Sequence, residues 1–153
     1  MADEQQSTCG PVLVIEDSWH DLVLMTHVLD DLDLKGHVVA VHNGAAALER
    51  IADIENGRVH TPAAIIVDLS LPDISAEQLI AEIRRQSSLE KTPVIVFSDG
   101  PIEQLQAMVD KFALQGCCEK PADFDEFQKR FAELISRWTG GRGEKSKSAD
   151  GAA

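Results

Sequence analysis

Four short apolar runs, each followed by polar residues, limit what this chain can fold into more than any other feature. The runs cover residues 11–15, 63–67, 93–97 and, more weakly, 116–118. The polar residues that come after them are Glu16, Asp17, Asp68, Ser98 and Lys120. In an open parallel sheet, ligands bind at the carboxyl ends of the strands. If the runs are strands of one sheet, three acids, a hydroxyl and an ammonium group converge at one edge.

Helical patterns separate these runs. Ser18 is placed to cap a first helix whose apolar residues repeat at helical spacing as far as Leu32. Residues 37–42 are predicted to form a second strand, and further helices are predicted at residues 44–54, 76–85, 101–116 and 123–138. Gly116 is expected to end the fourth helix, because glycine is favoured just past a helix. Five strands alternating with five helices predict an α/β fold with a doubly wound five-stranded parallel sheet.

Two other groups of residues are interpreted as core packing and not as ligand sites. One is the apolar stripe of the last predicted helix, which consists of Phe124, Phe127, Phe131, Leu134, Ile135 and Trp138. The other is the neighbouring pair Cys117 and Cys118. Together with Cys9, this pair lacks the spacing of a zinc site or of a disulfide framework. Neither group predicts a cofactor.

Length and composition fit one domain. The chain has 153 residues, 44% of them apolar, which is enough for one well-buried core. We expect this domain to cover residues 10–139. Residues 1–9 and 140–153 contain few large apolar side chains. We therefore predict a mobile N-terminal segment and a disordered C-terminal tail, since neither end can bury enough apolar surface to become ordered.

Charge and hydropathy argue against several classes of partner. The formal net charge of −12 is unfavourable for a large nucleic-acid surface, which requires clustered Lys and Arg. No apolar run approaches the roughly 20 residues that cross a bilayer, and the first residues lack the pattern of a signal peptide. We therefore expect a cytoplasmic protein with no nucleic-acid or membrane partner. Other proteins are the expected partners.

The polar residues at the predicted strand ends favour one chemistry. Carboxylates suit a divalent cation such as Mg²⁺, which prefers oxygen ligands. A hydroxyl and an ammonium group suit the oxygens of a transferable phosphoryl group. Each residue alone has an ordinary alternative, since Asp68 could cap a helix, Ser98 could lie in a turn and Lys120 could be a solvated surface side chain. The whole set predicts metal-dependent phosphoryl chemistry.

Four segments carry a family resemblance. They are residues 12–18 (VLVIEDS), 65–73 (IIVDLSLPD), 94–98 (VIVFS) and 119–121 (EKP). In this order they resemble the receiver domain of bacterial two-component response regulators. The resemblance implies the flavodoxin-like receiver fold. The stretch at residues 56–62, together with the lack of an evident output domain, resembles more narrowly the stand-alone single-domain regulators of bacterial phytochromes.

The resemblance implies a role for each residue of the set. Asp68 is the implied phosphoacceptor, whose carboxylate attacks the phosphohistidine of a histidine kinase. Ser98 is expected to donate its hydroxyl to one phosphoryl oxygen, and Lys120 is expected to balance the charge on the others. Neighbouring acids are expected to raise the pKa of Asp68 by like-charge repulsion. The resemblance also implies a cis peptide bond between Lys120 and Pro121.

The same resemblance implies a Mg²⁺ site. Asp17, Asp68 and the backbone carbonyl of Ser70 are the expected ligands, and Glu16 binds the ion directly or through a water molecule. The protein is not expected to be an enzyme on other substrates, since it catalyses only its own phosphorylation and dephosphorylation. Its output is expected to pass through a protein-binding surface that phosphorylation changes.

Two positions depart from the family pattern. Ala76 replaces the usual glycine eight positions after Asp68. Cys117 replaces the aromatic residue that usually lies three positions before Lys120 and that reports activation to the surface. Because a cysteine is too small to fill the space of an aromatic ring, signal output is expected to take a different route here.

Several alternatives stay open. One is a phosphorelay shuttle, which passes the phosphoryl group to a histidine phosphotransfer protein. Another is a pseudo-receiver, an interaction module that is never phosphorylated. A third is an independent metal-dependent phosphatase, which is disfavoured because the set contains no separate base beside a nucleophile. A homodimer through the fourth helix, the fifth strand and the fifth helix is also predicted, with reciprocal contacts across a two-fold axis.

Overall fold

We describe the fold from a computed structural model of the chain, which describes residues 10–138. The predicted N-terminal segment and C-terminal tail lie outside these residues, as does residue 139 of the predicted domain. The described chain forms one five-stranded parallel sheet: β1 (Val12–Ile15), β2 (Val38–Val41), β3 (Ala64–Val67), β4 (Val94–Ser98) and β5 (Gly116–Glu119). The strand order is β2-β1-β3-β4-β5, so the order reverses beside β1 and the two ends of the sheet are β2 and β5.

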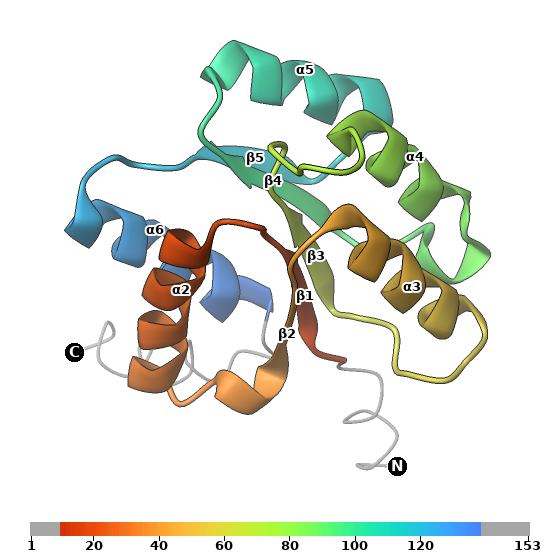
Figure 1. Cartoon of the computed structure of the whole chain (residues 1–153), viewed down its shortest axis with the longest axis horizontal. Helices are drawn as coiled ribbons and strands as arrows, with labels where there is room; N and C mark the ends of the chain where they lie inside the picture. Colours follow the sequence, from red (N-terminus) through yellow and green to blue (C-terminus); the bar gives the residue numbers. More distant parts are fainter. Residues whose placement is uncertain (1–9, 139–153) are drawn as a thin grey trace.

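Five α-helices cover the two faces of the sheet (Figure 1). They are α2 (Trp19–Asp31), α3 (Gly44–Glu55), α4 (Ala76–Arg85), α5 (Ile102–Phe112) and α6 (Phe124–Trp138). Helices α2 and α6 lie on one face, and α3, α4 and α5 lie on the other. Two 3-10 turns, Lys35–His37 and Ser87–Leu89, lie in the connections before β2 and β4. The predicted doubly wound fold is confirmed.

The predicted N-caps form as expected. The side chains of Ser18, Asn43 and Ser75 each accept a hydrogen bond from the backbone N–H three residues ahead, at 3.2, 2.7 and 3.1 Å. Each cap satisfies one of the N–H groups that a helix leaves without a partner in its first turn. These caps therefore fix where α2, α3 and α4 begin, close to the carboxyl ends of the strands that precede them.

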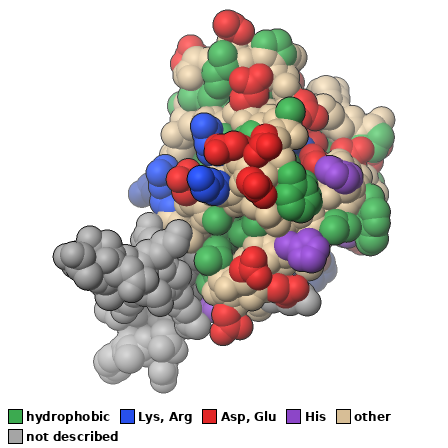
Figure 2. Space-filling model, turned by 90° about the vertical axis from the view of Figure 1, so that its left-hand side faces the viewer, with side chains coloured by type: hydrophobic (Ala, Val, Ile, Leu, Met, Phe, Trp, Pro, Cys, Tyr) green, Lys and Arg blue, Asp and Glu red, His purple; other side chains and the backbone are tan. Residues whose placement is uncertain are grey.

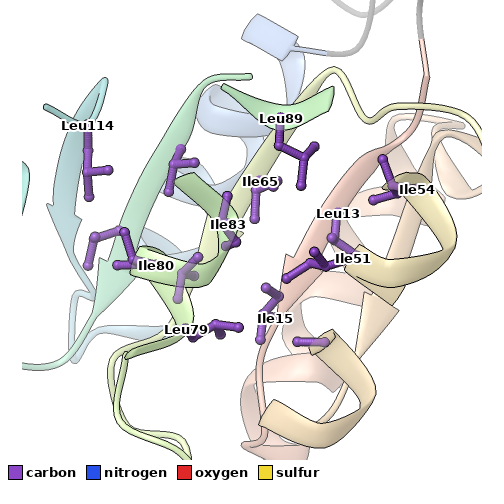
Figure 3. Packing of buried hydrophobic residues seen from close by; sticks show 14 of the residues in the cluster. Leu13, Ile15, Ile51, Ile54, Ile65, Leu79, Ile80, Ile83, Leu89 and Leu114 are labelled. Carbon is purple, nitrogen blue, oxygen red and sulfur yellow. The ribbon is translucent and has the colours of Figure 1, made fainter. Parts of the chain in front are cut away.

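The strands carry two hydrophobic cores because successive side chains point to opposite faces of the sheet. On β1, Leu13 and Ile15 pack under α3, α4 and α5, whereas Val12 and Val14 pack under α2 and α6. Figure 3 shows part of the first core, in which isoleucine and leucine side chains of α3 and α4 meet those of β1 and β3. Each fully buried side chain of this kind contributes about 1.5–3 kcal/mol. The two cores hold the sheet edge that carries the polar residues.

Four details differ from the sequence predictions. Helix α5 ends at Phe112, not at Gly116, because Ala113 adopts the left-handed conformation (φ 53°) that terminates it, and Gly116 is the first residue of β5. The second strand is shorter than residues 37–42, since residues 35–37 form a 3-10 turn. Phe124 is 53% exposed and not part of the core, because it lies in the first turn of α6, beyond the edge of the sheet. No peptide bond among residues 10–138 is cis, so the Lys120–Pro121 bond is trans, the intrinsically preferred form.

The helices in the described part of the chain are unsuited to a bilayer. None of those helices is both long enough and apolar enough to cross one. The longest, α6, has 15 residues and alternates apolar with charged side chains. It uses its apolar face to cover the sheet.

Candidate phosphoacceptor site

The sheet itself positions the polar residues, because its hydrogen-bonded ladder continues one residue past three of the strands. The backbone N–H of Glu16 donates to the carbonyl of Val41 at 3.0 Å, and that of Asp68 donates to the carbonyl of Ile15 at 3.0 Å. The N–H of Lys120 donates to the carbonyl of Ser98 at 2.8 Å. Glu16, Asp68 and Lys120 are therefore held by the backbone before any side-chain contact is made.

Asp68 lies at the centre of the group and is buried, with 4% of its surface exposed. Its Oδ1 accepts hydrogen bonds from the Ser98 hydroxyl at 2.8 Å and from the backbone N–H of Ser70 at 3.1 Å. The Ser98 Oγ in turn accepts from the N–H of Leu69 at 3.2 Å, which fixes the loop after Asp68. The predicted meeting of Asp68 and Ser98 is thus present as a direct contact.

Lys120 reaches the same carboxylate from the other side. Its Nζ lies 3.1 Å from Asp68 Oδ2, 2.8 Å from Glu16 Oε1 and 2.7 Å from Asp21 Oδ2. The Lys120 side chain is 2% exposed, and its Nζ lies 5.9 Å from the centre of the Phe97 ring. The alternative interpretation of Lys120 as a solvated surface lysine is therefore wrong. A buried ammonium group holds three carboxylates together.

Three carboxylates at this edge are arranged so that they could hold a metal ion. One oxygen from each of Glu16, Asp17 and Asp68 lies within 4.8 Å of the others. Glu16 and Asp68 are buried, whereas Asp17 is accessible to solvent, so an ion can reach the cluster from outside. Oxygen-only ligands of this kind suit Mg²⁺, which keeps several of its waters. The backbone carbonyl of Ser70 lies in the loop after Asp68, and its part in metal binding stays a prediction.

Protonation in this cluster differs from the sequence expectation. Burial raises the pKa of Glu16 to about 8, and hydrogen bonding with Asp68 adds to the rise, although Lys120 opposes it. Burial also favours a higher pKa for Asp68, but hydrogen bonds from Glu16, the charge of Lys120 and the bonds from Ser70 and Ser98 outweigh it and lower that pKa. The predicted rise for Asp68 is therefore wrong. Burial thus raises the pKa of Glu16, while the hydrogen bonds and the Lys120 charge around Asp68 favour its ionised form.

The raised pKa of Glu16 gives a testable pH dependence. Its folded pKa of about 8 lies above the ordinary 4.5, so the folded state binds this proton more tightly than the unfolded state. The stability that this proton supplies is complete below pH 4.5 and is lost as the pH rises to 8. In EDTA, the free energy of unfolding from urea titrations is expected to fall over this range for the wild type. Glu16→Gln should flatten the fall, and an unchanged slope in that variant would contradict the assignment.

Sequence reasoning missed Asp21, which contacts Lys120 from the first turn of α2. An acid at this position is ordinary, because carboxylates near a helix N-terminus stabilise the helix. The sequence offered one usable signal, namely that Asp21 follows Asp17, which lies at a predicted strand end, by four positions. A cavity of about 310 Å³ opens beside this contact, and its lining includes Asp21, Lys120 and the exposed Phe124.

The two departures from the family pattern have different consequences. Ala76 is the first residue of α4, and Asp33 and Ala113 are the only non-glycine residues with positive φ among residues 10–138. The backbone at residue 76 therefore does not require glycine. Cys117 is half-buried in β5, with its Sγ 3.8 Å from Oε1 of Gln106 on α5. At this position, relatives are expected to have an aromatic side chain in place of the smaller cysteine.

Comparison with known proteins agrees with the fold. The model of the response regulator receiver domain family matches residues 12–132. The two-component response regulator PhoP of Pseudomonas aeruginosa is 31% identical over 135 residues, which cover 84% of this chain and 53% of PhoP. The chain thus spans about half the length of that relative.

Two solved structures have the same fold. The phosphorylated cyanobacterial phytochrome response regulator RcpA superimposes with a TM-score of 0.76 at 22% identity, covering 86% of this chain and 94% of RcpA. The Mn²⁺-bound form of the response regulator Rcp1 gives a TM-score of 0.73 at 22% identity, covering 86% of this chain and 95% of that structure. Because the family match extends over most of the described residues, this chain belongs to the response regulator receiver domains of two-component systems.

Proposed function

We propose that this receiver domain accepts a phosphoryl group on Asp68 from the phosphohistidine of a histidine kinase, in a reaction that depends on Mg²⁺. The observation that carries the proposal is the set of contacts around the Asp68 carboxylate. Ser98 and the N–H of Ser70 donate to one oxygen, and Lys120 donates to the other. These are the donors that a phosphoryl group on the same carboxylate would need.

The proposed reaction uses these groups with little rearrangement. An Asp68 oxygen attacks phosphorus and forms the new O–P bond, while the bond from phosphorus to the histidine nitrogen breaks and its electron pair stays on the imidazole. Ser98 and Lys120 then donate to the phosphoryl oxygens in place of the carboxylate oxygens. Bound Mg²⁺ would supply positive charge against the acids and the incoming phosphoryl group. Glu16, Asp17 and Asp68 would hold the ion, because their oxygens form the carboxylate cluster.

We further propose that the kinase is a phytochrome-type sensor and that the chain acts as a stand-alone regulator in the cytoplasm. The similarity in fold to RcpA, named as a phytochrome response regulator, supports this choice. The net charge of −12 and the mixing of acidic with basic side chains on the face in Figure 2 support a protein partner in preference to nucleic acid. We expect catalysis only of its own phosphorylation and dephosphorylation.

The alternatives differ in the fate of the phosphoryl group and in whether one is accepted at all. A phosphorelay shuttle uses the same site, so it stays the second candidate. A pseudo-receiver is disfavoured because the buried Lys120 and its three carboxylates form a costly polar cluster that a purely structural domain has no reason to bury. Homodimer formation through α5, β5 and α6 also stays a proposal, and light scattering with and without a phosphoryl mimic tests it.

Removal of one metal ligand tests the metal dependence. Asp17→Ala is expected to weaken Mg²⁺ binding by more than about tenfold, because the cluster has only three carboxylates. Phosphorylation by acetyl phosphate should fall in parallel, and EDTA should abolish it in the wild type. Calorimetry measures the metal affinity, and intact-mass analysis measures the phosphoryl group.

A matched variant separates the effect of losing a metal ligand from the effect of losing a negative charge. Asp99→Ala removes one acid just beyond β4 that is outside the carboxylate cluster, so its metal affinity should stay close to that of the wild type. If Asp17→Ala binds Mg²⁺ as tightly as Asp99→Ala does, the ion does not bind at the proposed cluster.

A further inference from the structure

Asp21 makes the shortest contact of the buried lysine. Its Oδ2 lies 2.7 Å from Lys120 Nζ, against 2.8 Å for Glu16 and 3.1 Å for Asp68. A lysine ammonium group has three N–H donors, so these three carboxylates account for all of them. The Asp21 side chain is 15% exposed, which keeps the contact largely away from solvent.

Asp21 differs from the other two partners in what else it binds. Glu16 and Asp68 belong to the carboxylate cluster that could hold a metal ion, and within the described residues Asp21 does not belong to it. Binding of a cation or a phosphoryl group would therefore give Glu16 and Asp68 new partners. The contact between Asp21 and Lys120 would not need to change. Among residues 10–138, the other oxygen of Asp21 contacts the ring of the exposed His20, at 3.4 Å.

The backbone of Asp21 is itself fixed. Its N–H donates to the Ser18 Oγ at 3.2 Å, which is the N-cap bond of α2. The next turns of α2 bury Leu24, Met25 and Val28 in the same core as Phe97, the ring beneath the Lys120 ammonium group. The Asp21 carboxylate is therefore presented from a rigid helix, as a positioning group needs to be.

We propose that Asp21 is a positioning residue, which holds Lys120 in place while the partners of that lysine change during phosphoryl transfer. This inference rests on the proposed function. When an Asp68 oxygen bonds to phosphorus and the donor leaves with its electron pair, the N–H that pointed at Asp68 becomes available to a phosphoryl oxygen. The bond to Asp21 keeps the ammonium group within reach of that oxygen throughout.

A purely electrostatic role for Asp21 predicts the opposite sign. Asp21 adds negative charge beside a site that receives an anion, so removing the charge should speed phosphorylation. A positioning role predicts slower phosphorylation at saturating donor, because the lysine is then less well placed for the transition state. The direction of the change therefore distinguishes the two.

Phosphorylation kinetics test the proposal in the full chain. Phosphoramidate serves as donor, so that a P–N bond breaks and ammonia leaves, with Mg²⁺ present. Asp21→Asn keeps the shape of the side chain and removes its charge, Asp21→Glu keeps the charge, and Asp31→Asn removes a charge from the other end of the same helix. We expect the rate at saturating donor to fall about fivefold in Asp21→Asn, and to stay within about twofold of the wild type in the other two variants.

A second measurement does not depend on phosphorylation. The ammonium protons of Lys120, observed by ¹⁵N–¹H NMR in the wild type, should exchange with water about tenfold faster in Asp21→Asn and be restored in Asp21→Glu. The positioning role is overturned if the exchange rate in Asp21→Asn is unchanged. It is also overturned if the phosphorylation rate of Asp21→Asn at saturating donor equals or exceeds that of Asp31→Asn. A wild type that no donor phosphorylates overturns the proposed function instead, and the exchange rates then decide whether Asp21 holds Lys120.

Discussion

Replacement of Asp68 by asparagine is expected to lower phosphorylation by acetyl phosphate and Mg²⁺ by more than about 100-fold, since an amide is not a nucleophile. Asparagine keeps one oxygen that can accept the hydrogen bonds from Ser98 and Ser70, so the fold should survive. The loss would therefore report chemistry and not unfolding. Intact-mass analysis over time gives the rate for the wild type and for the variant.

Asp73→Asn is the matched control for this loss. Asp73 lies in the same loop, but its carboxylate accepts from the N–H groups of Gly44 and Ala45 at the start of α3 and makes no contact with the site. The phosphorylation rate of Asp73→Asn should stay within a few-fold of the wild-type rate. A larger change is not expected, because the substitution weakens hydrogen bonds worth about as much as one neutral hydrogen bond, outside the site. Labelling of Asp68→Asn at the rate of Asp73→Asn would exclude Asp68 as the acceptor.

Lys120→Met should destabilise the folded protein more than any other single change at the site. The side chain of Lys120 is 2% exposed and pairs with Glu16, Asp21 and Asp68. Removing one partner of a buried ion pair typically costs about 3–5 kcal/mol, because it leaves uncompensated charge in a medium of low dielectric. Urea titrations of the wild type and of Lys120→Met under the same conditions measure the difference.

Two further variants sharpen the Lys120 prediction. Lys111→Met removes an exposed lysine that pairs with Glu77, and a surface pair of this kind contributes at most about 1 kcal/mol. Adding Glu16→Gln to Lys120→Met should recover part of the lost stability, since it removes one of the acids whose charge Lys120 balances. If Lys120→Met lost no more stability than Lys111→Met, the buried ion-pair cluster would not contribute to the stability of the fold.

The fold and most of the site residues could be predicted because both depend on local sequence patterns. Each strand is a short apolar run, and the residue after it is carried to the sheet edge by the backbone ladder, as Asp68 is by its bond to Ile15. Such a residue needs no long-range information beyond the parallel arrangement of the strands. The caps Ser18, Asn43 and Ser75 are local signals of the same kind.

The contacts that could not be predicted depend on residues far apart in the chain. Asp21 and Lys120 are separated by 99 positions, and they meet because α2 packs beside α6 on the same face of the sheet. The lowered pKa of Asp68 arises from four neighbours on four different segments, so residue type alone suggested the opposite direction. The end of α5 was misplaced because Ala113 adopts a left-handed conformation that alanine rarely favours.

Direct mapping of the modified residue tests most directly whether Asp68 is the phosphoacceptor. The wild type is incubated with acetyl phosphate and Mg²⁺, the acyl phosphate is reduced with borohydride, and the digest is sequenced by tandem mass spectrometry. We expect one modified residue, Asp68, whose modification is absent when EDTA replaces Mg²⁺. The assignment would be contradicted if the modification were found at Glu16, at Asp17 or at a histidine in place of Asp68. It would also be contradicted if the wild type stayed unmodified with every donor.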